Sequence, residues 1–327
     1  MVEKIIKIKT VTPMFLGNVN KKAEMKVTSL KGVLRYWWRA STPNEKIEKL
    51  FEKEMEIFGG IKGEKGQKSK LSIILLSKSV PDGSISKEKF YEPAYKWRIH
   101  TYGGNKDTNV LSYLSYGAVS WDKNIKQTIV TQEYFKSNTT FEFKLVCDND
   151  KIWNETEKAL KCIHLFGGLG AKSRNGFGSV EVWLDNKPII GNDNKEISNF
   201  IDNIKGNNEY KYPTFSKQTI VWKTKKAFLS WEDALKEIGE VYIKAKLGLD
   251  DHYNYTNRRQ IALPISALKN KNDSESRDAK VYFLKVIKKE NGFVGQILFL
   301  PYIEKSVYKE FNNNINSMNK MEVVYGR

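Results

Sequence analysis

The first half of the chain carries hydrophobic residues at two spacings, which separate its expected strands from its expected helices. Residues 3–12 alternate Ile with Lys, as a half-buried strand does. Apolar residues at helical spacing predict one helix that begins near Ser29 and another over residues 44–58, closed by the two glycines that follow. Residues 59–70 are then expected to form a Gly and Lys loop. The other elements expected here are strands over 70–79 and 139–147, a helix over 152–166 and a strand after the glycine-rich run that follows it.

The same order of elements returns in the second half of the chain. The pattern predicts a strand over 217–223, a helix over 231–247, a hairpin over 280–300 turning at Glu290-Asn291-Gly292, a helix over 303–318 and a strand over 321–325. Both halves then have the order β, α, β, β, α, β, which is the ferredoxin-like order shared with RNA-recognition domains. The sequence therefore predicts an α+β protein with two tandem ferredoxin-like (RNA-recognition-like, βαββαβ) domains carrying insertions.

An asparagine-rich stretch without an apolar period divides the two halves. We expect a linker over 186–216, an N-terminal domain over 1–185 and a C-terminal domain over 217–327. The N-terminal domain has a long insertion at about 80–130. Residues 90–121 hold 8 aromatic residues in 32 positions, or 25%, against 12% for the whole chain. That density indicates a segment that packs on another surface.

The net charge of the chain indicates the class of partner that it binds. The chain of 327 residues has 55 Lys and Arg against 38 Asp and Glu, a net charge of +17. Lysine supplies most of it, as in many proteins from AT-rich genomes, so the 8 arginines are the sharper signal. Residues 1–50 alone hold 11 basic and 4 acidic side chains. The balance favours nucleic acid or an anionic membrane surface, and 40% hydrophobic residues exclude a disordered chain.

Cysteine content and hydropathy indicate the cellular location to expect for the protein. Cys147 and Cys162 are too few for a disulfide framework or a zinc cluster, so we expect two reduced buried thiols and a cytoplasmic location. No apolar run reaches the length of a membrane span, about 18 residues, and no signal-peptide pattern opens the chain, so no membrane partner is expected. Asp250-Asp251-His252 favours an acidic loop over a metal site, because adjacent oxygen ligands point in different directions. No cofactor is expected.

The helix expected from Ser29 is the first candidate for anion binding. Lys31, Arg35 and Arg39 recur at i, i+4 and i+8 and share one helical face, with Trp38 beside them. Like charges at this spacing repel by roughly a few tenths of a kcal/mol per pair. Arginine offers a planar fork that holds phosphate bidentately. Two interpretations stay open: an RNA-binding face, or a solvated basic face over a tryptophan-anchored core.

A glycine-rich loop after the helix over 152–166 is the second candidate. The positions that could contact RNA are Gly167, Gly168, Gly170, Lys172, Ser173, Arg174, Gly176 and Gly178. Glycines let backbone N–H groups turn towards a phosphate, and the two cations add charge. The Walker order Gly-Lys-Ser/Thr is absent, and the loop follows a helix instead of opening one. An RNA-backbone cradle and a tight turn needing positive φ both fit the pattern.

His164 is the one histidine placed for chemistry on RNA. It shares a polar helical face with Glu157 and Lys161, one turn before the glycine-rich loop. A histidine can serve as general acid or base in metal-independent RNA cleavage. A nuclease using His164 is therefore the alternative to a non-catalytic binding role.

These segments together resemble one family. The segments that carry the resemblance are Thr12–Gly17, Ser29–Ala40, Phe58-Gly59-Gly60, the glycine-rich loop and Arg258–Pro264. They are similar to the RAMP superfamily, and within it to subunit one of the Cmr complex, a type III-B CRISPR effector. The stretch Lys-Gly-x-x-Arg-x-Trp-Trp-Arg-Ala is specific, and the match touches both expected domains in order. Lys172 stands where the family pattern has Arg, and Leu263 where it has Ser.

The resemblance implies a fold, a role and partners. It implies tandem ferredoxin-like domains, a place at the head end of a crRNA-guided assembly beside other Cmr RAMP subunits, and contact with crRNA or target single-stranded RNA in antiviral defence. It implies no catalytic role for this subunit. It also adds Arg258 and Arg259 to the expected RNA contacts, although alone they are a pair of adjacent surface cations.

Overall fold

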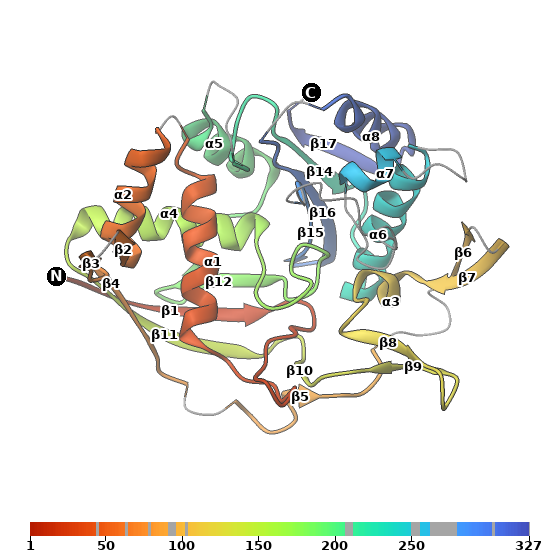
Figure 1. Cartoon of the computed structure of the whole chain (residues 1–327), viewed down its shortest axis with the longest axis horizontal. Helices are drawn as coiled ribbons and strands as arrows, with labels where there is room; N and C mark the ends of the chain where they lie inside the picture. Colours follow the sequence, from red (N-terminus) through yellow and green to blue (C-terminus); the bar gives the residue numbers. More distant parts are fainter. Residues whose placement is uncertain are drawn as a thin grey trace.

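The computed structural model describes the chain over residues 1–43, 46–62, 65–77, 80–90, 96–101, 104–206, 212–249, 256–261, 280–302 and 305–326. Two βαββαβ units lie side by side in it (Figure 1). The predicted fold class, α+β with tandem ferredoxin-like units, is confirmed by the strand order of both sheets. The bounds 1–185, 186–216 and 217–327 for separate domains stay a prediction.

The N-terminal unit is an antiparallel sheet with helices on one face. Its strands are β1 (Val2–Thr10), β4 (Leu71–Leu75), β11 (Thr140–Cys147), β12 (Val180–Leu184) and β13 (Lys187–Pro188), in the order β13-β12-β1-β11-β4. Its helices are α1 (Val27–Ala40), α2 (Ile47–Phe58) and α4 (Asp150–Phe166). Helix α1 begins before the predicted Ser29, with Lys26 at its N-cap and no side-chain cap hydrogen bond.

The C-terminal unit repeats this topology. Its elements are β14 (Ile220–Thr224), α6 (Trp231–Leu247), α7 (Thr256–Ile261), β15 (Tyr282–Lys289), β16 (Gly292–Phe299), α8 (Ser306–Ser317) and β17 (Met321–Tyr325). The sheet order is β15-β16-β14-β17, so the first and third strands of the unit are central, as in the N-terminal sheet. The predicted bounds of α6 and β17 match the structure, and the other predicted ends shift by a few residues, as helix and strand ends commonly do.

The C-terminal sheet is buried on both faces, which fixes how the units are joined. Phe283 and Leu298 belong to the core that α1 and α4 form with the N-terminal sheet. Tyr282 and Ile297, their neighbours in sequence, point to the opposite face and pack with α6 and α8. Successive side chains of a strand face opposite sides, so both sides of β15 and β16 must be apolar. The layers are therefore sheet, helices, sheet, helices.

The aromatic insertion packs on the C-terminal unit. It contains β5 (Ile85–Ser86), β6 (Lys96–Thr101), β7 (Gly104–Asn109), α3 (Val110–Leu114), β8 (Val119–Asp122), β9 (Gln127–Val130) and β10 (Tyr134–Phe135). In Figure 1 it passes below the N-terminal sheet to α3, which packs on α6, and returns through β8 and β9 to β10, which pairs with β5. Val110 and Leu114 of α3 reach so close to Gly239 of α6 that a Cβ there would lie 2.6 Å and 2.8 Å from their side-chain carbons.

Two segments expected to lack regular structure contain it. The asparagine-rich stretch over 186–216 includes α5 (Asn194–Ile204), whose Ile197, Ile201 and Ile204 are buried. Their spacing is a helical period that the many asparagines around it obscured. The expected Gly and Lys loop over 59–70 contains the short strands β2 (Gly60–Lys62) and β3 (Lys65–Gln67), which pair with each other.

Three composition-based expectations can be compared with the structure. Cys147 and Cys162 are buried and unpaired, as predicted. Within the described ranges, no helix is both long and apolar enough to cross a membrane. The same ranges hold no group of three or more His, Cys, Asp or Glu side chains that could bind a metal ion, and Asp250-Asp251-His252 lies outside them.

Two glycines provide a matched test of these backbone constraints. Gly178 has φ +61°, and a Cβ there would overlap the carbonyl oxygen of Leu169, whereas Gly32 is exposed in α1 and a Cβ there would have nothing within 4 Å. We expect Gly178→Ala to lower the free energy of unfolding by at least about 2 kcal/mol. Gly32→Ala should raise it by about 0.5–1 kcal/mol, because alanine favours helix. Urea denaturation measures both, and equal effects would contradict this account.

Candidate nucleic-acid interface

The three cations of α1 lie on one face, as predicted, and hold α2 against α1. Arg35 donates to the carbonyl of Gly59 at 2.5 Å, and its Nε lies 3.2 Å from Glu54 Oε1. The Nε of Arg39 lies 3.4 Å from the other carboxylate oxygen of Glu54. Lys31 donates to Ser69 Oγ at 2.9 Å. Arg39 is the more exposed of the two arginines, with 44% of its side chain in solvent.

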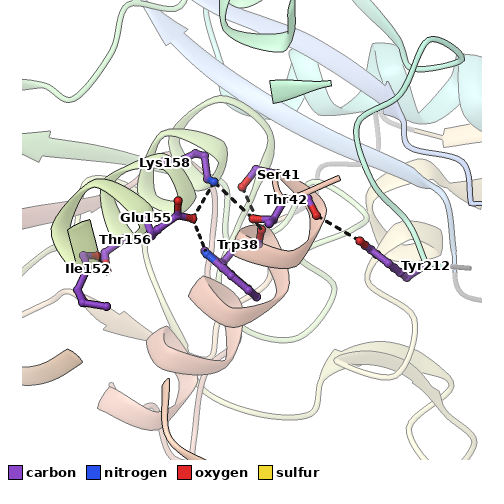
Figure 2. A network of polar contacts seen from close by, with 8 residues as sticks. All are labelled: Trp38, Ser41, Thr42, Ile152, Glu155, Thr156, Lys158 and Tyr212. Carbon is purple, nitrogen blue, oxygen red and sulfur yellow. Dashed lines mark hydrogen bonds and ion pairs between the residues drawn. The ribbon is translucent and has the colours of Figure 1, made fainter. Parts of the chain in front are cut away.

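Trp38 lies between α1 and α4, not beside a surface (Figure 2). It is 1% exposed, and its indole N–H donates to Glu155 Oε2 at 2.7 Å. Lys158 binds the same carboxylate oxygen at 2.7 Å. The expected RNA contact of Trp38 is therefore corrected: its place on the apolar stripe of α1 puts the ring in the core, where no base can reach it.

Close packing explains the glycines of the glycine-rich loop. Gly170 and Gly176 have φ of +83° and +90°, a region that other residues rarely adopt. A Cβ at Gly168 would lie 2.7 Å from the carbonyl oxygen of Gly178, and one at Gly167 would lie 2.6 Å from Trp37 Nε1. Of the two interpretations left open by the sequence, the tight turn accounts for these residues.

Several backbone N–H groups of the loop are used inside the molecule. Leu169 donates to the carbonyl of Gly178 at 2.9 Å, Ala171 to that of Phe15 at 2.7 Å and Gly178 to that of Pro13 at 2.8 Å. These groups cannot form the predicted phosphate cradle at the same time. What the loop presents to solvent is the partly exposed side chains of Lys172, Ser173 and Arg174.

The loop also brings its cations to the seam between the two units. The guanidinium of Arg174 lies 5.1 Å from the ring centre of Tyr36 in α1 and 5.0 Å from that of Phe283 in β15. It donates to the carbonyl of Lys280 at 3.2 Å, and Lys280 Nζ donates back to the carbonyl of Arg174 at 3.1 Å. We call Lys172, Arg174 and Lys280 the seam cluster.

The seam cluster has no counter-ion in the described part of the chain. No carboxylate there forms an ion pair with Lys172, Arg174 or Lys280. Burial lowers the pKa of Lys280 well below its usual value, and the positive charges of Lys246, Arg174 and Lys172 lower it further. An anion placed here would relieve that repulsion.

Tyr36 connects the seam cluster to α1. Its hydroxyl is buried and has no hydrogen-bond partner among the described residues. Burial raises the pKa of Tyr36 to about 12, while the positive charges of Arg174 and Arg39 act in the opposite direction. The structure therefore brings Arg39 and Arg174 to the same tyrosine, whereas Lys31 lies two turns earlier along α1 and faces Ser69.

His164 lies inside the molecule. It is 4% exposed, and its Nδ1 accepts the backbone N–H of Val182 at 2.9 Å. Burial, followed by the positive charge of Lys285, lowers the pKa of His164 to about 3. The expected RNA-facing position is therefore corrected: a neutral, enclosed imidazole has neither the access nor the pKa of a general acid or base at neutral pH.

Lys285 is a buried cation that the sequence analysis missed. Its ammonium donates to the carbonyls of Ile163 at 3.2 Å, Gly167 at 2.6 Å and Val180 at 2.9 Å, at the C-terminal end of α4. The carbonyls and the negative helix end favour the ammonium. Burial nevertheless outweighs them and lowers the pKa of Lys285 to about 7. A lysine that interrupts the apolar run of residues 282–287 was the available signal.

Arg258 and Arg259 lie in α7, next to α6 and α8. Their side chains are outside the described part of the structure, so the structure does not place them against the seam cluster. Leu263 and Pro264 lie outside it altogether.

Fold and sequence together define the class of protein. The family model of the RAMP superfamily matches residues 7–181, more than half of the chain, which contains α1 and the glycine-rich loop. The chain therefore belongs to the RAMP superfamily, as its motifs indicated.

Individual relatives carry the comparison further. The chain is 27% identical over 192 residues to the CRISPR system Cmr subunit Cmr1-2 of Pyrococcus furiosus, covering 56% of this chain and 97% of that protein. The crystal structure of Cmr1 from Pyrococcus furiosus in its apo form superposes with a TM-score of 0.60 and 18% identity over 100% of this chain and 99% of that one. A chain of the type III-B Cmr-beta complex bound to cognate target RNA superposes with a TM-score of 0.52 and 12% identity over 96% and 100%. The likeness to Cmr subunit one that the motifs indicated is thus confirmed.

The buried ammonium of Lys285 predicts a pH dependence of stability. Its pKa is about 7 in the folded protein, against 10.5 for an ordinary lysine. Between these values the unfolded chain binds a proton that the folded chain does not. The free energy of unfolding should therefore rise with pH in this window, by up to about 1.4 kcal/mol per pH unit. We expect Lys285→Met to flatten the slope. Near pH 10, where the wild type bears little of the cost of the lowered pKa, the variant should be the less stable protein, because three carbonyls lose this donor.

Urea denaturation of both proteins from pH 7 to 10 measures the two slopes. Lys309→Met, which changes an exposed lysine of α8, is the matched control and should leave the slope unchanged. Equal slopes for the wild type and Lys285→Met would show that the Lys285 ammonium keeps an ordinary pKa.

Proposed function

We propose that this chain is a non-catalytic subunit of a type III-B CRISPR Cmr ribonucleoprotein complex, and that it binds single-stranded RNA along the seam between its two units. The observation that carries the proposal is the seam cluster, three converging cations without a carboxylate partner in the described residues. Phosphate is the anion that RNA offers at regular spacing, and cations that contact it bind RNA of any sequence.

The geometry of Arg174 suits a phosphate contact. Its guanidinium lies near two aromatic rings and donates one hydrogen bond to the Lys280 carbonyl, so its orientation is set before any ligand arrives. A guanidinium has five N–H donors, which leaves several for a phosphate. Arg39, held from one side by Glu54, extends the positive surface along α1.

The side chain of Lys172 contributes charge to the seam cluster, while its backbone carbonyl accepts the N–H of Asn175 at 2.8 Å. Its ammonium has no hydrogen-bond or ion-pair partner among the described residues, and its backbone is left-handed, with φ +62°. A left-handed conformation disfavours most non-glycine residues. A lysine that adopts it at the edge of a positive cluster fits a binding role better than a packing role.

The relatives supply the biological setting of the proposal. The similar curated protein is named as a Cmr subunit, and two of the similar structures are chains of Cmr-beta complexes bound to cognate target RNA. We infer that the partners of this chain are crRNA, target RNA and other Cmr RAMP subunits, in the cytoplasm. The burial of His164 favours this binding role over the RNA endonuclease weighed as its alternative.

The proposal predicts a salt-dependent RNA affinity that depends on the exposed cations. The logarithm of the affinity for single-stranded RNA should fall with the logarithm of salt concentration by about 0.7 for each phosphate neutralised. We expect Arg39→Ala combined with Lys172→Ala to weaken binding and to reduce the slope by about 1.4. Arg174→Lys should keep the slope and still weaken binding, because an ammonium cannot bind a phosphate bidentately. Fluorescence anisotropy of a labelled oligonucleotide at several salt concentrations measures these quantities.

Lys309→Ala is the matched control, since it removes an exposed lysine of α8 on the far side of the C-terminal unit. It should change neither affinity nor slope. Unchanged RNA binding by the folded Arg39→Ala, Lys172→Ala protein would remove the seam from the RNA site.

A further inference from the structure

Two aromatic side chains of the insertion extend into solvent. Tyr116 follows α3 and is 68% exposed, and Trp121 in β8 is 61% exposed. The neighbouring apolar residues of the same segment, Ala118 and Val119, are buried. The two rings are thus exposed on a segment whose adjoining apolar residues are buried.

The base beneath the two rings is firmly anchored. Val110 and Leu114 of α3 are buried against α6. Val119 pairs with Val130 in the β8–β9 hairpin, and Tyr116 forms a bridge to Val119. Rings held on such a base lose little conformational freedom when a flat partner stacks on them.

The glycine-rich loop places positive charge beside the turn that carries Tyr116. Asn175 of the loop donates to the carbonyl of Leu114 at 2.7 Å, which ties the loop to the end of α3. The ammonium of Lys172 lies 3.3 Å from the position that a Cβ would take at Gly117, the residue after Tyr116. Lys172 of the seam cluster and the exposed ring of Tyr116 thus flank the same turn.

The charges of the hairpin itself also favour a polyanion. Lys123 and Lys126 are exposed in the turn that connects β8 to β9. The carboxylate of Asp122 is occupied within that turn, where it accepts the backbone N–H groups of Asn124 at 2.8 Å and Ile125 at 3.4 Å. Exposed rings set among lysines are the arrangement with which proteins bind single-stranded nucleic acid.

We propose that Tyr116 and Trp121 stack on bases of a single-stranded RNA whose phosphates pass Lys172. The proposal rests on the proposed RNA-binding function and adds a second kind of contact to it. Stacking uses the face of a base, which every nucleotide has, and so adds affinity without reading sequence. A protein subunit is the other possible occupant, but an apolar protein surface would gain nothing from the lysines around the rings.

The test is a double-mutant cycle that compares the binding of normal RNA and of abasic RNA to the wild type and to variants lacking the aromatic rings. We expect Tyr116→Ala and Trp121→Ala each to weaken binding of a single-stranded oligonucleotide by about five-fold or more. The salt slope should stay as in the wild type, because no phosphate contact is removed. An oligonucleotide of the same length with abasic sites should bind the wild type more weakly. The double variant should bind the normal and the abasic oligonucleotide equally.

The controls separate this inference from the proposed function. Ile125→Ala removes an exposed apolar side chain from the same hairpin without removing a ring, and should have no effect. An aromatic double variant that keeps full affinity for normal RNA, while the wild type shows its salt-dependent binding, overturns the stacking inference and leaves the proposed function intact. An equal loss for normal and abasic RNA also overturns it. A wild type that binds no RNA overturns both.

Discussion

Strand β15 is the open edge of the C-terminal sheet, and the glycine-rich loop supplies the hydrogen bonds that this edge needs. The carbonyl of Arg174 accepts the N–H of Leu284 at 3.1 Å, and Ser179 Oγ accepts that of Val286 at 3.1 Å. Between them, the side chain of Lys285 reaches the end of α4 and donates to the carbonyls of Ile163 and Gly167. One contact thus satisfies an edge strand and a helix end that would otherwise be buried without partners. It also fixes how the two units face each other.

The candidate interface is a consequence of that contact. The glycine-rich loop runs along β15 and turns tightly, so its glycines are needed for close packing. Only its central residues face solvent. Two of those residues, Lys172 and Arg174, are cations, and Lys280, just before β15, lies beside them. Like charges this close repel one another and destabilise the fold. Cation–π contacts of Arg174 with the rings of Tyr36 and Phe283 offset part of this repulsion. The surplus charge that remains is available to a ligand.

The sequence predicted the elements and their order, because hydrophobic periodicity and turn residues are local properties. It did not predict the environment of residues that contact the other unit. His164 lies on the polar face of an amphipathic helix, which in a helix with one buried side faces water. Helix α4 instead lies between two sheets, so that face meets Lys285. Likewise, the sequence does not distinguish a glycine that exposes its backbone N–H to a ligand from a glycine that is required because a Cβ would clash with a neighbouring group. Gly178 is of the second kind. The cation pattern of α1 was predicted correctly, whereas its partner Glu54 needed the structure.

The insertion brings a further segment of the chain to the seam between the two units. It leaves the N-terminal sheet, packs α3 on α6 and returns beside the glycine-rich loop, so three segments distant in sequence meet at one end of the seam. The proposed phosphate contact at the seam and the proposed stacking on the insertion share one property, since neither distinguishes one base from another. A surface of this kind accepts any RNA sequence. In an effector guided by RNA, sequence is read by base pairing between guide and target, so its protein subunits need to hold the strand without selecting it. The chemistry proposed for the seam fits that requirement, because cations bind the phosphate that every nucleotide carries and rings stack on any base.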